Sequence, residues 1–207
     1  MSDIRVVLAS QSPRRKEILE LAQIEFEICP SDIEEIQTSD KPEEVCVELC
    51  KQKALDVASK IKAYNDLHPD ITTPQDILVI GADTIVSFDG MILGKPKDEE
   101  DAVGMLCKLS GAVNDVFTGV SLVFMSREGR VGEHTFYERT SVTFNDIPQD
   151  EIKKYVESGE PMDKAGSYGI QGYLAKYISK IDGDYYNVMG LPLARIIKEL
   201  DSLGVNL

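Results

Sequence analysis

The sequence predicts an α/β fold in which helices flank a mixed, twisted sheet. Short apolar runs alternate along the chain with longer segments of helical periodicity, which is typical of strands followed by helices. Dipeptides of an acidic residue and glycine separate some of the apolar runs, and such turns predict antiparallel hairpins. No internal repeat or low-complexity linker divides the chain, so residues 1–207 are expected to form a single domain, with room for two lobes.

Each element predicted in the first half of the chain has its own local signal. The first apolar run suits a buried strand, and Ser12-Pro13 then opens a helix because serine caps helices and proline fits the first helical position. A second helix also begins at a proline, and the apolar run after it predicts a strand that leads into the Asp89-Gly90 turn. In order, these elements are expected at residues 4–9, 13–21, 42–61 and 77–86. The polar residues 62–76 are expected to form a surface loop.

Glycine-containing turns mark the predicted elements of the second half. A helix stops at Gly111, two strands surround the Glu128-Gly129 turn, and a further helix ends at Gly159. A last strand precedes another Asp-Gly turn, and a closing helix runs up to Gly204. In order, these elements are expected at residues 97–109, 116–124, 131–144, 147–157, 176–181 and 192–203.

The charge balance excludes one broad class of partner. The chain carries 36 acidic and 22 basic side chains, a formal net charge of −14. Because no basic stripe compensates this charge, binding to nucleic-acid polymers is not expected.

The four cysteines form no C-x-x-C pair, and the chain begins with no signal peptide and contains no apolar stretch of the roughly 20 residues that cross a bilayer. We therefore expect a cytoplasmic protein with reduced thiols and no membrane partner.

The first turn of the first predicted helix has the wrong charge for its position. Arg14, Arg15 and Lys16 lie where the helix dipole favours acidic residues. A bound phosphate would explain them, since its oxygens could accept from the helix N–H groups, from the Ser10 or Ser12 hydroxyl and from an arginine. The alternative is that the two arginines pair with nearby Glu17, Glu20 or Glu25 on the surface.

Two further charged residues lie inside apolar patterns. Asp83 interrupts the apolar strand at residues 77–86, where a carboxylate costs several kcal/mol unless it is paired, hydrogen-bonded or metal-bound. Gly81 would let another group approach this strand closely. Lys53 falls within the apolar arc of its helix. Asp83 is a candidate general base or metal ligand and Lys53 a candidate phosphate contact; the alternatives are a satisfied structural aspartate and a lysine that extends to solvent.

Loops supply the remaining candidates. Lys95 stands between a glycine and a proline on a stiff loop, and Glu34 and Glu35 are spare carboxylates near a strand end. Residues 163–172 contain three glycines, which let backbone approach a ligand, and Gln171 could read the edge of a base because its amide both donates and accepts. Each of these could also be an ordinary solvated surface feature.

Several common sites are absent from the sequence. There is no G-x-x-x-x-G-K-[ST] loop and no G-x-G-x-x-G fingerprint, and the two histidines make a Ser-His-Asp triad unexpected. The remaining combination of cations, carboxylates and a glycine-rich loop suggests hydrolysis of a phosphoanhydride. Two carboxylates could hold Mg²⁺ or Mn²⁺, and a carboxylate could activate the attacking water.

The same segments resemble the Maf family of nucleoside triphosphate pyrophosphatases, once described as septum formation inhibitors. The matching motifs lie in the family's order at residues 8–15, 81–84, 94–96, 118–120 and 163–172. The resemblance implies a fold shared with inosine-triphosphate pyrophosphatases, with two lobes around a cleft. It also implies a homodimer and hydrolysis of a nucleoside triphosphate to the monophosphate and pyrophosphate with a divalent cation.

The resemblance also implies roles for single residues. Asp83 would accept the proton, and Glu35 would join it in holding metal or water. The implied phosphate contacts are Ser10, Arg14, Arg15, Lys53 and Lys95. The implied substrate-specificity positions are Arg14, Thr84 and Gln171. Asp115 departs from the family, which usually carries a histidine there, and this leaves the role of that position open.

The residues of two motifs are similar to those of the subfamily that acts on dTTP and UTP. These motifs are Ala-Asp-Thr at residues 82–84 and Tyr-Gly-Ile-Gln at 168–171. Gln171 could pair with the N3–H and O4 edge of uracil or thymine, and modified pyrimidine nucleotides are further expected substrates. Two alternatives stay open: a nucleotide-sensing regulator of cell division without turnover, and a pyrophosphatase of the 7-methyl-GTP type. The buried carboxylate favours the enzyme, because a pure binder needs no base.

Overall fold

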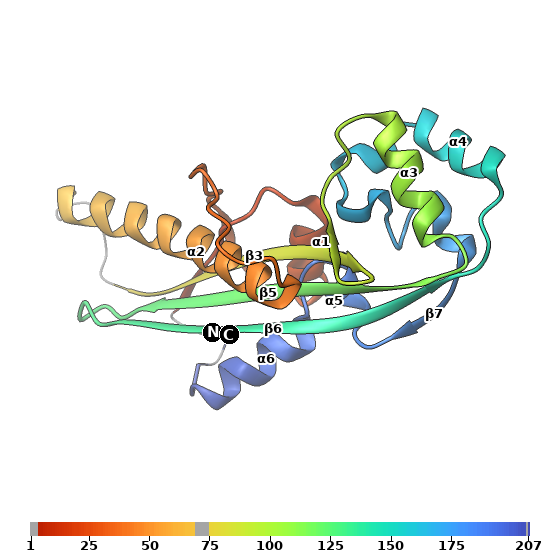
Figure 1. Ribbon diagram of the computed structural model, residues 1–207. Coiled ribbons are helices and arrows are strands. Elements are labelled where there is room, and N and C mark those ends of the chain that lie inside the picture. Colours follow the sequence, from red (N-terminus) through yellow and green to blue (C-terminus); the bar gives the residue numbers. More distant parts are fainter. Residues whose placement is uncertain (1–3, 69–74, 206) are drawn as a thin grey trace.

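The fold is built on one mixed sheet, seen edge-on in the computed structural model (Figure 1), which describes residues 4–68, 75–205 and 207. Its strands are β1 (Ile4–Leu8), β2 (Glu27–Ile28), β3 (Asp76–Phe88), β4 (Met91–Leu93), β5 (Val113–Met125), β6 (Val131–Phe144) and β7 (Ile178–Asp182). The strand order is β2-β1-β3-β5-β6-β7, and β4 pairs with β3 outside this path. β1 runs parallel to β2 and β3, and all other pairs are antiparallel. The predicted α/β fold with a mixed sheet is therefore confirmed.

Helices cover both faces of this sheet. They are α1 (Pro13–Leu21), α2 (Pro42–Leu67), α3 (Glu99–Leu109), α4 (Gln149–Glu157), α5 (Tyr185–Met189) and α6 (Leu193–Ser202). Three 3₁₀ turns follow α4: η1 (Glu160–Asp163), η2 (Ala165–Ser167) and η3 (Tyr173–Tyr177). Helix α2 lies along one face and α6 along the other, while α3 and α4 form a separate group at one end of the sheet (Figure 1).

The central strands are apolar at successive positions because both of their faces are covered. In β1, Val6 and Leu8 pack into a cluster that includes residues of α1 and α6. Val7, on the opposite face, packs into a cluster with residues of α2. A further buried cluster lies between α3, α4 and the ends of β5 and β6. Asp83 and Thr84 are only partly buried and lie between two buried stretches of β3; on the face of Thr84, the cover of the sheet changes there from the first of these clusters to the third.

Two glycines let α2 approach the sheet closely. A Cβ atom on Gly81 of β3 would lie 2.5 Å from the carbonyl oxygen of Cys50, and one on Gly119 of β5 would lie 2.2 Å from that of Cys46. Both distances are far below a van der Waals contact, so no side chain fits at either position. The expectation that Gly81 permits close approach is confirmed, and its consequence is that α2 can reach Asp83.

Some predicted boundaries were wrong. The expected loop at 62–76 is helical up to Leu67, and β3 already begins at Asp76; the predicted surface positions 69–74 lie outside the described residues. Lys62 and Asp66 pair across one helical turn at 3.3 Å, which is compatible with a solvated end of α2. The short strand β2 and helix α5 were not predicted, because each depends on packing rather than on its own periodicity.

The cysteines form no disulfide, in agreement with the expected reduced thiols. All four are free, and burial raises the pKa of Cys46 to about 12, so this thiol stays protonated. None of the helices in the described part of the chain combines the length and hydropathy that a membrane crossing requires. The cytoplasmic location stays a prediction.

Candidate functional site

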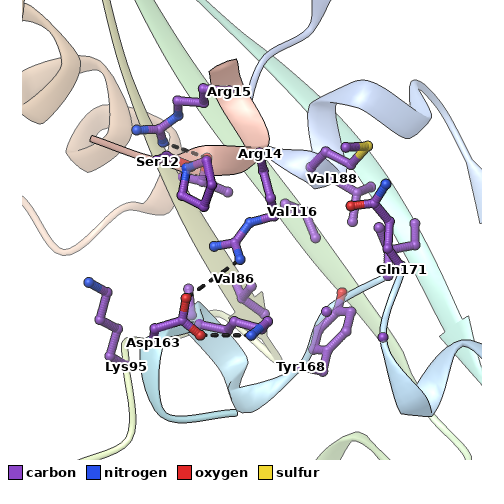
Figure 2. A pocket seen from close by; sticks show the side chains of 18 of the residues that line it. Ser12, Arg14, Arg15, Val86, Lys95, Val116, Asp163, Tyr168, Gln171 and Val188 are labelled. Atoms are coloured by element: carbon purple, nitrogen blue, oxygen red, sulfur yellow. Dashed lines mark hydrogen bonds and ion pairs between the residues drawn. The ribbon is translucent and has the colours of Figure 1, made fainter. Parts of the chain in front are cut away.

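A cavity of about 550 Å³ opens beside the N-terminus of α1, the middle of β3 and residues 160–172 (Figure 2). It brings together side chains from segments far apart in the sequence. The predicted site residues that line it are Ser10, Arg14, Arg15, Lys53, Asp83, Thr84, Lys95 and Gln171. Glu35 is not among the lining residues and reaches the site through Lys53.

Lys53 joins the two predicted carboxylates. Its Nζ lies 2.5 Å from Asp83 Oδ1 and 2.9 Å from Glu35 Oε1. The Lys53 and Asp83 side chains are only 17% and 13% exposed, whereas that of Glu35 is 44% exposed. This burial strengthens the pairing between ammonium and carboxylate. The interpretation of Lys53 as a lysine that extends to solvent is therefore wrong.

The two carboxylates fit a divalent cation only in part. They supply the oxygen ligands that Mg²⁺ and Mn²⁺ prefer. Within residues 4–68, 75–205 and 207, however, no group of three or more His, Cys, Asp or Glu side chains is placed to hold a metal ion. Mg²⁺ usually takes one or two carboxylates and completes its shell with water and substrate phosphates. Asp83 and Glu35 match that pattern, in which the substrate contributes to the metal site.

Arg15 ties three parts of the chain together. Its guanidinium donates from Nε to the Gly190 carbonyl oxygen at 2.8 Å, from Nη1 to Ser10 Oγ at 3.0 Å and from Nη2 to Thr84 Oγ1 at 3.1 Å. Burial lowers the pKa of Arg15, an effect that the nearby charge of Asp83 opposes. Thr84 continues the network, since its Oγ1 lies 3.0 Å from Thr118 Oγ1. Here Arg15 binds protein acceptors, and its phosphate contact stays a prediction.

Arg14 points across the cavity toward the segment after α4 (Figure 2). Its Nη1 lies 3.6 Å from Asp163 Oδ2, and the other carboxylate oxygen accepts from Lys164 Nζ at 2.7 Å. Burial would raise the pKa of Asp163, but the hydrogen bond from Lys164 and the charge of Arg14 outweigh it and lower that pKa. The first turn of α1 contains no acidic residue. The Asp163 carboxylate therefore lies between two cations, Arg14 and Lys164, and a phosphate contact of Arg14 stays a prediction.

The alternative explanation of the basic helix start, in which the two arginines pair with nearby surface glutamates, is wrong. Lys16 pairs with Glu20 on the exposed side of α1, at 3.6 Å. Arg14 and Arg15 instead turn toward the cavity, as their contacts with Asp163 and Thr84 show.

Sequence reasoning missed Lys164 and Glu160, which also line the cavity. Lys164 is 14% exposed, and a Cβ atom on Gly169 would lie 3.0 Å from its Cε. A Cβ atom on Gly172 would lie 1.7 Å from Glu160 Oε1. The glycines of this segment thus make room for two charged side chains. No local signal marks either residue, because charged side chains in a polar segment look solvated until this packing is known.

Lys95 and Gln171 lie on opposite sides of the residues drawn in Figure 2. The loop of Lys95 is held by a hydrogen bond from the Gly166 N–H to the Gly94 carbonyl oxygen, at 3.0 Å. Beside Gln171, Tyr168 is buried and its hydroxyl donates to Asn114 Oδ1 at 2.9 Å.

Asp115 does not take part in the cavity. On β5 its two carboxylate oxygens accept from Ser141 Oγ at 2.6 Å and from Arg139 Nη2 at 2.8 Å. The departure from the family at this position therefore falls on a contact between neighbouring strands, away from the cavity lining.

Comparison with known proteins finds relatives along nearly the whole chain. The chain is 55% identical to a protein of Agathobacter rectalis and 43% identical to one of Lachnoclostridium phytofermentans, each named dTTP/UTP pyrophosphatase; the alignments cover 98% of this chain and 98% and 97% of those proteins. A solved dITP/XTP pyrophosphatase of Mycobacterium abscessus is 11% identical and covers 96% of this chain and 98% of its own, with a TM-score of 0.38, too low to support an argument. The model of the Maf family, described as Maf-like protein, matches residues 5–203. Over nearly its whole length, then, this chain belongs to the Maf family.

Proposed function

We propose that this protein hydrolyses dTTP, UTP and related pyrimidine nucleoside triphosphates to the monophosphate and pyrophosphate. The observation that carries the proposal is Asp83, a carboxylate that is only 13% exposed yet lines a cavity together with several cations. A cavity of about 550 Å³ suits a small-molecule ligand such as a nucleotide. The relatives named dTTP/UTP pyrophosphatase support the same substrates.

In the proposed reaction Asp83 is the general base. Lys53 holds Asp83 Oδ1, so Oδ2 is the oxygen that takes the proton from the attacking water. The water oxygen forms a bond to the α-phosphorus, the bond from this phosphorus to the bridging oxygen breaks, and pyrophosphate leaves. Arg14, Lys95 and Lys164 neutralise the phosphate charge. A divalent cation bound by Asp83 and Glu35 would supply further positive charge there.

The direct test is pyrophosphate release from a panel of nucleoside triphosphates with Mg²⁺ or Mn²⁺. We expect the highest kcat/KM for dTTP and UTP. Binding of nucleotides without turnover by well-folded protein would favour the regulator, and preference for 7-methyl-GTP would overturn the substrate assignment. The homodimer stays a prediction, which sedimentation would test.

Gln171 is proposed to read the pyrimidine. Replacing it in Gln171→Ala removes the amide that pairs with N3–H and O4, so kcat/KM for UTP should fall about tenfold, the value of one good hydrogen bond. Steady-state kinetics with UTP and CTP measure the change, and discrimination between them should shrink. Gln149→Ala is the matched control, since Gln149 contacts Cys107 outside the cavity. Unchanged discrimination would remove Gln171 from base recognition.

Asp163 is proposed to compete with phosphate for Arg14 and Lys164. In Asp163→Asn both cations lose their anionic partner, so pyrophosphate should bind roughly fivefold more tightly, as expected for an exposed charge pair. Titration calorimetry with pyrophosphate measures this, and the melting temperature should barely move. Asp182→Asn removes a carboxylate that pairs with Lys180 away from the cavity and should bind as the parent does. Weaker binding in Asp163→Asn would mean that this carboxylate instead orients the two cations.

A further inference from the structure

Glu35 lies in a segment without helix or strand, between β2 and α2. Its side chain is 44% exposed, yet its carboxylate lies 2.9 Å from Lys53 Nζ. A long, exposed side chain on an irregular segment samples many positions unless the backbone beneath it is held. The placement of Glu35 therefore requires a device that orders residues 30–41.

A row of side chains along α2 provides this device. Residues four positions apart are neighbours on the surface of a helix, and here each of five side chains in such a row binds the segment. They are Glu44, Glu48, Gln52, Asp56 and Lys60. In the same order, their partners are Ser39, Thr38, Ile36, Ser31 and Asp32. The segment thus runs antiparallel to the helix and is attached to it along its length.

Gln52 makes the central contact of this row. Its Oε1 accepts from the Ile36 N–H at 2.9 Å, and its Nε2 donates to the Ile36 carbonyl oxygen at 2.6 Å. One amide therefore satisfies both backbone groups of Ile36, as a neighbouring strand would. The neighbours of these two residues also pair. Lys53, which follows Gln52 on α2, binds the side chain of Glu35, which precedes Ile36 in the segment.

We propose that Gln52 is a positioning residue: it fixes the backbone of Ile36 so that Glu35 stays against Lys53 beside Asp83. This inference rests on the proposed function, in which Glu35 and Asp83 act together. Gln52 does not line the cavity and acts only through Glu35. Loss of its two hydrogen bonds frees the segment at the point nearest Glu35 while the core under α2 remains intact.

The first experiment needs no nucleotide and no metal. In Gln52→Leu the amide hydrogen of Ile36 should exchange with solvent at least about tenfold faster, because its acceptor is gone, while exchange in β3 and β5 stays unchanged. The matched control is Lys51→Ala, the preceding residue on α2, whose side chain pairs with Glu133 instead of the segment. Unchanged Ile36 exchange in Gln52→Leu would overturn the proposed backbone role.

The second experiment asks whether the effect passes through Glu35. For UTP hydrolysis, kcat of Gln52→Leu should fall about tenfold with KM within a factor of two, as expected when a reacting group is misplaced but substrate binding persists. Under single-turnover conditions, Gln52→Leu should add no further loss in a Glu35→Gln background. An equal loss in both backgrounds would show that Gln52 acts independently of Glu35. If the parent protein shows no turnover, the proposed function is refuted but the role of Gln52 is not. The exchange experiment still decides that role, because it does not depend on turnover.

Discussion

We expect Asp83→Asn to lose nearly all pyrophosphate release while its fold stays intact. Asparagine has nearly the same shape, and its side-chain oxygen can still accept from Lys53, so the packing of α2 on β3 is preserved. It cannot take a proton from water, and loss of a general base lowers turnover by roughly 10²- to 10⁴-fold. The measurement is kcat for dTTP and UTP, with circular dichroism and the melting temperature as checks on folding.

The matched control for Asp83→Asn is Asp115→Asn. Asp115 lies on the neighbouring strand β5 and binds Arg139 outside the cavity, so its replacement should leave kcat close to that of the parent. Near-normal activity of Asp83→Asn would transfer the role of base to another group, and Glu35 would be the first to test.

Gly119→Ala is expected to cause the largest loss of stability. The added methyl would lie 2.2 Å from the carbonyl oxygen of Cys46 and 2.5 Å from its carbonyl carbon, and a helix backbone cannot yield as a flexible side chain can. Overpacking of this kind costs about 3 kcal/mol of the free energy of unfolding. For a chain of this size the melting temperature should fall by roughly 6–12 °C.

Turnover should fall in the same variant, because moving α2 away from the sheet separates Lys53 from Asp83. Calorimetry measures the fall in melting temperature, and UTP hydrolysis measures the fall in turnover. Gly132→Ala on β6 is the control, since an added Cβ there meets nothing within 4 Å. Equal melting temperatures for the two variants would show that close packing at Gly119 does not position α2.

The site was predictable where a residue violated the rules of its own element. Asp83 interrupts an apolar strand, and Arg14 and Arg15 oppose the dipole of α1. Both anomalies lead to residues that line the cavity. Lys164 violates no local rule, because a lysine in a polar segment looks solvated, and its burial follows only from packing against Gly169. Gln52 gives no local signal either, because a glutamine on a helix is ordinary until its partner is known.

Local periodicity and turn chemistry, which act over a few residues, determined most of the helices and strands and the two places where charge needed a partner. The sequence also carried the motifs through which the Maf family could be recognised. Only the tertiary structure decided that Lys53 lies between Asp83 and Glu35, and that Arg15 binds protein oxygens. The pairings of Lys53, and those of Arg15 with Thr84 and Gly190, join residues 18 to 175 positions apart. They depend on how closely α2 and α1 pack on the sheet, and no local pattern encodes that distance.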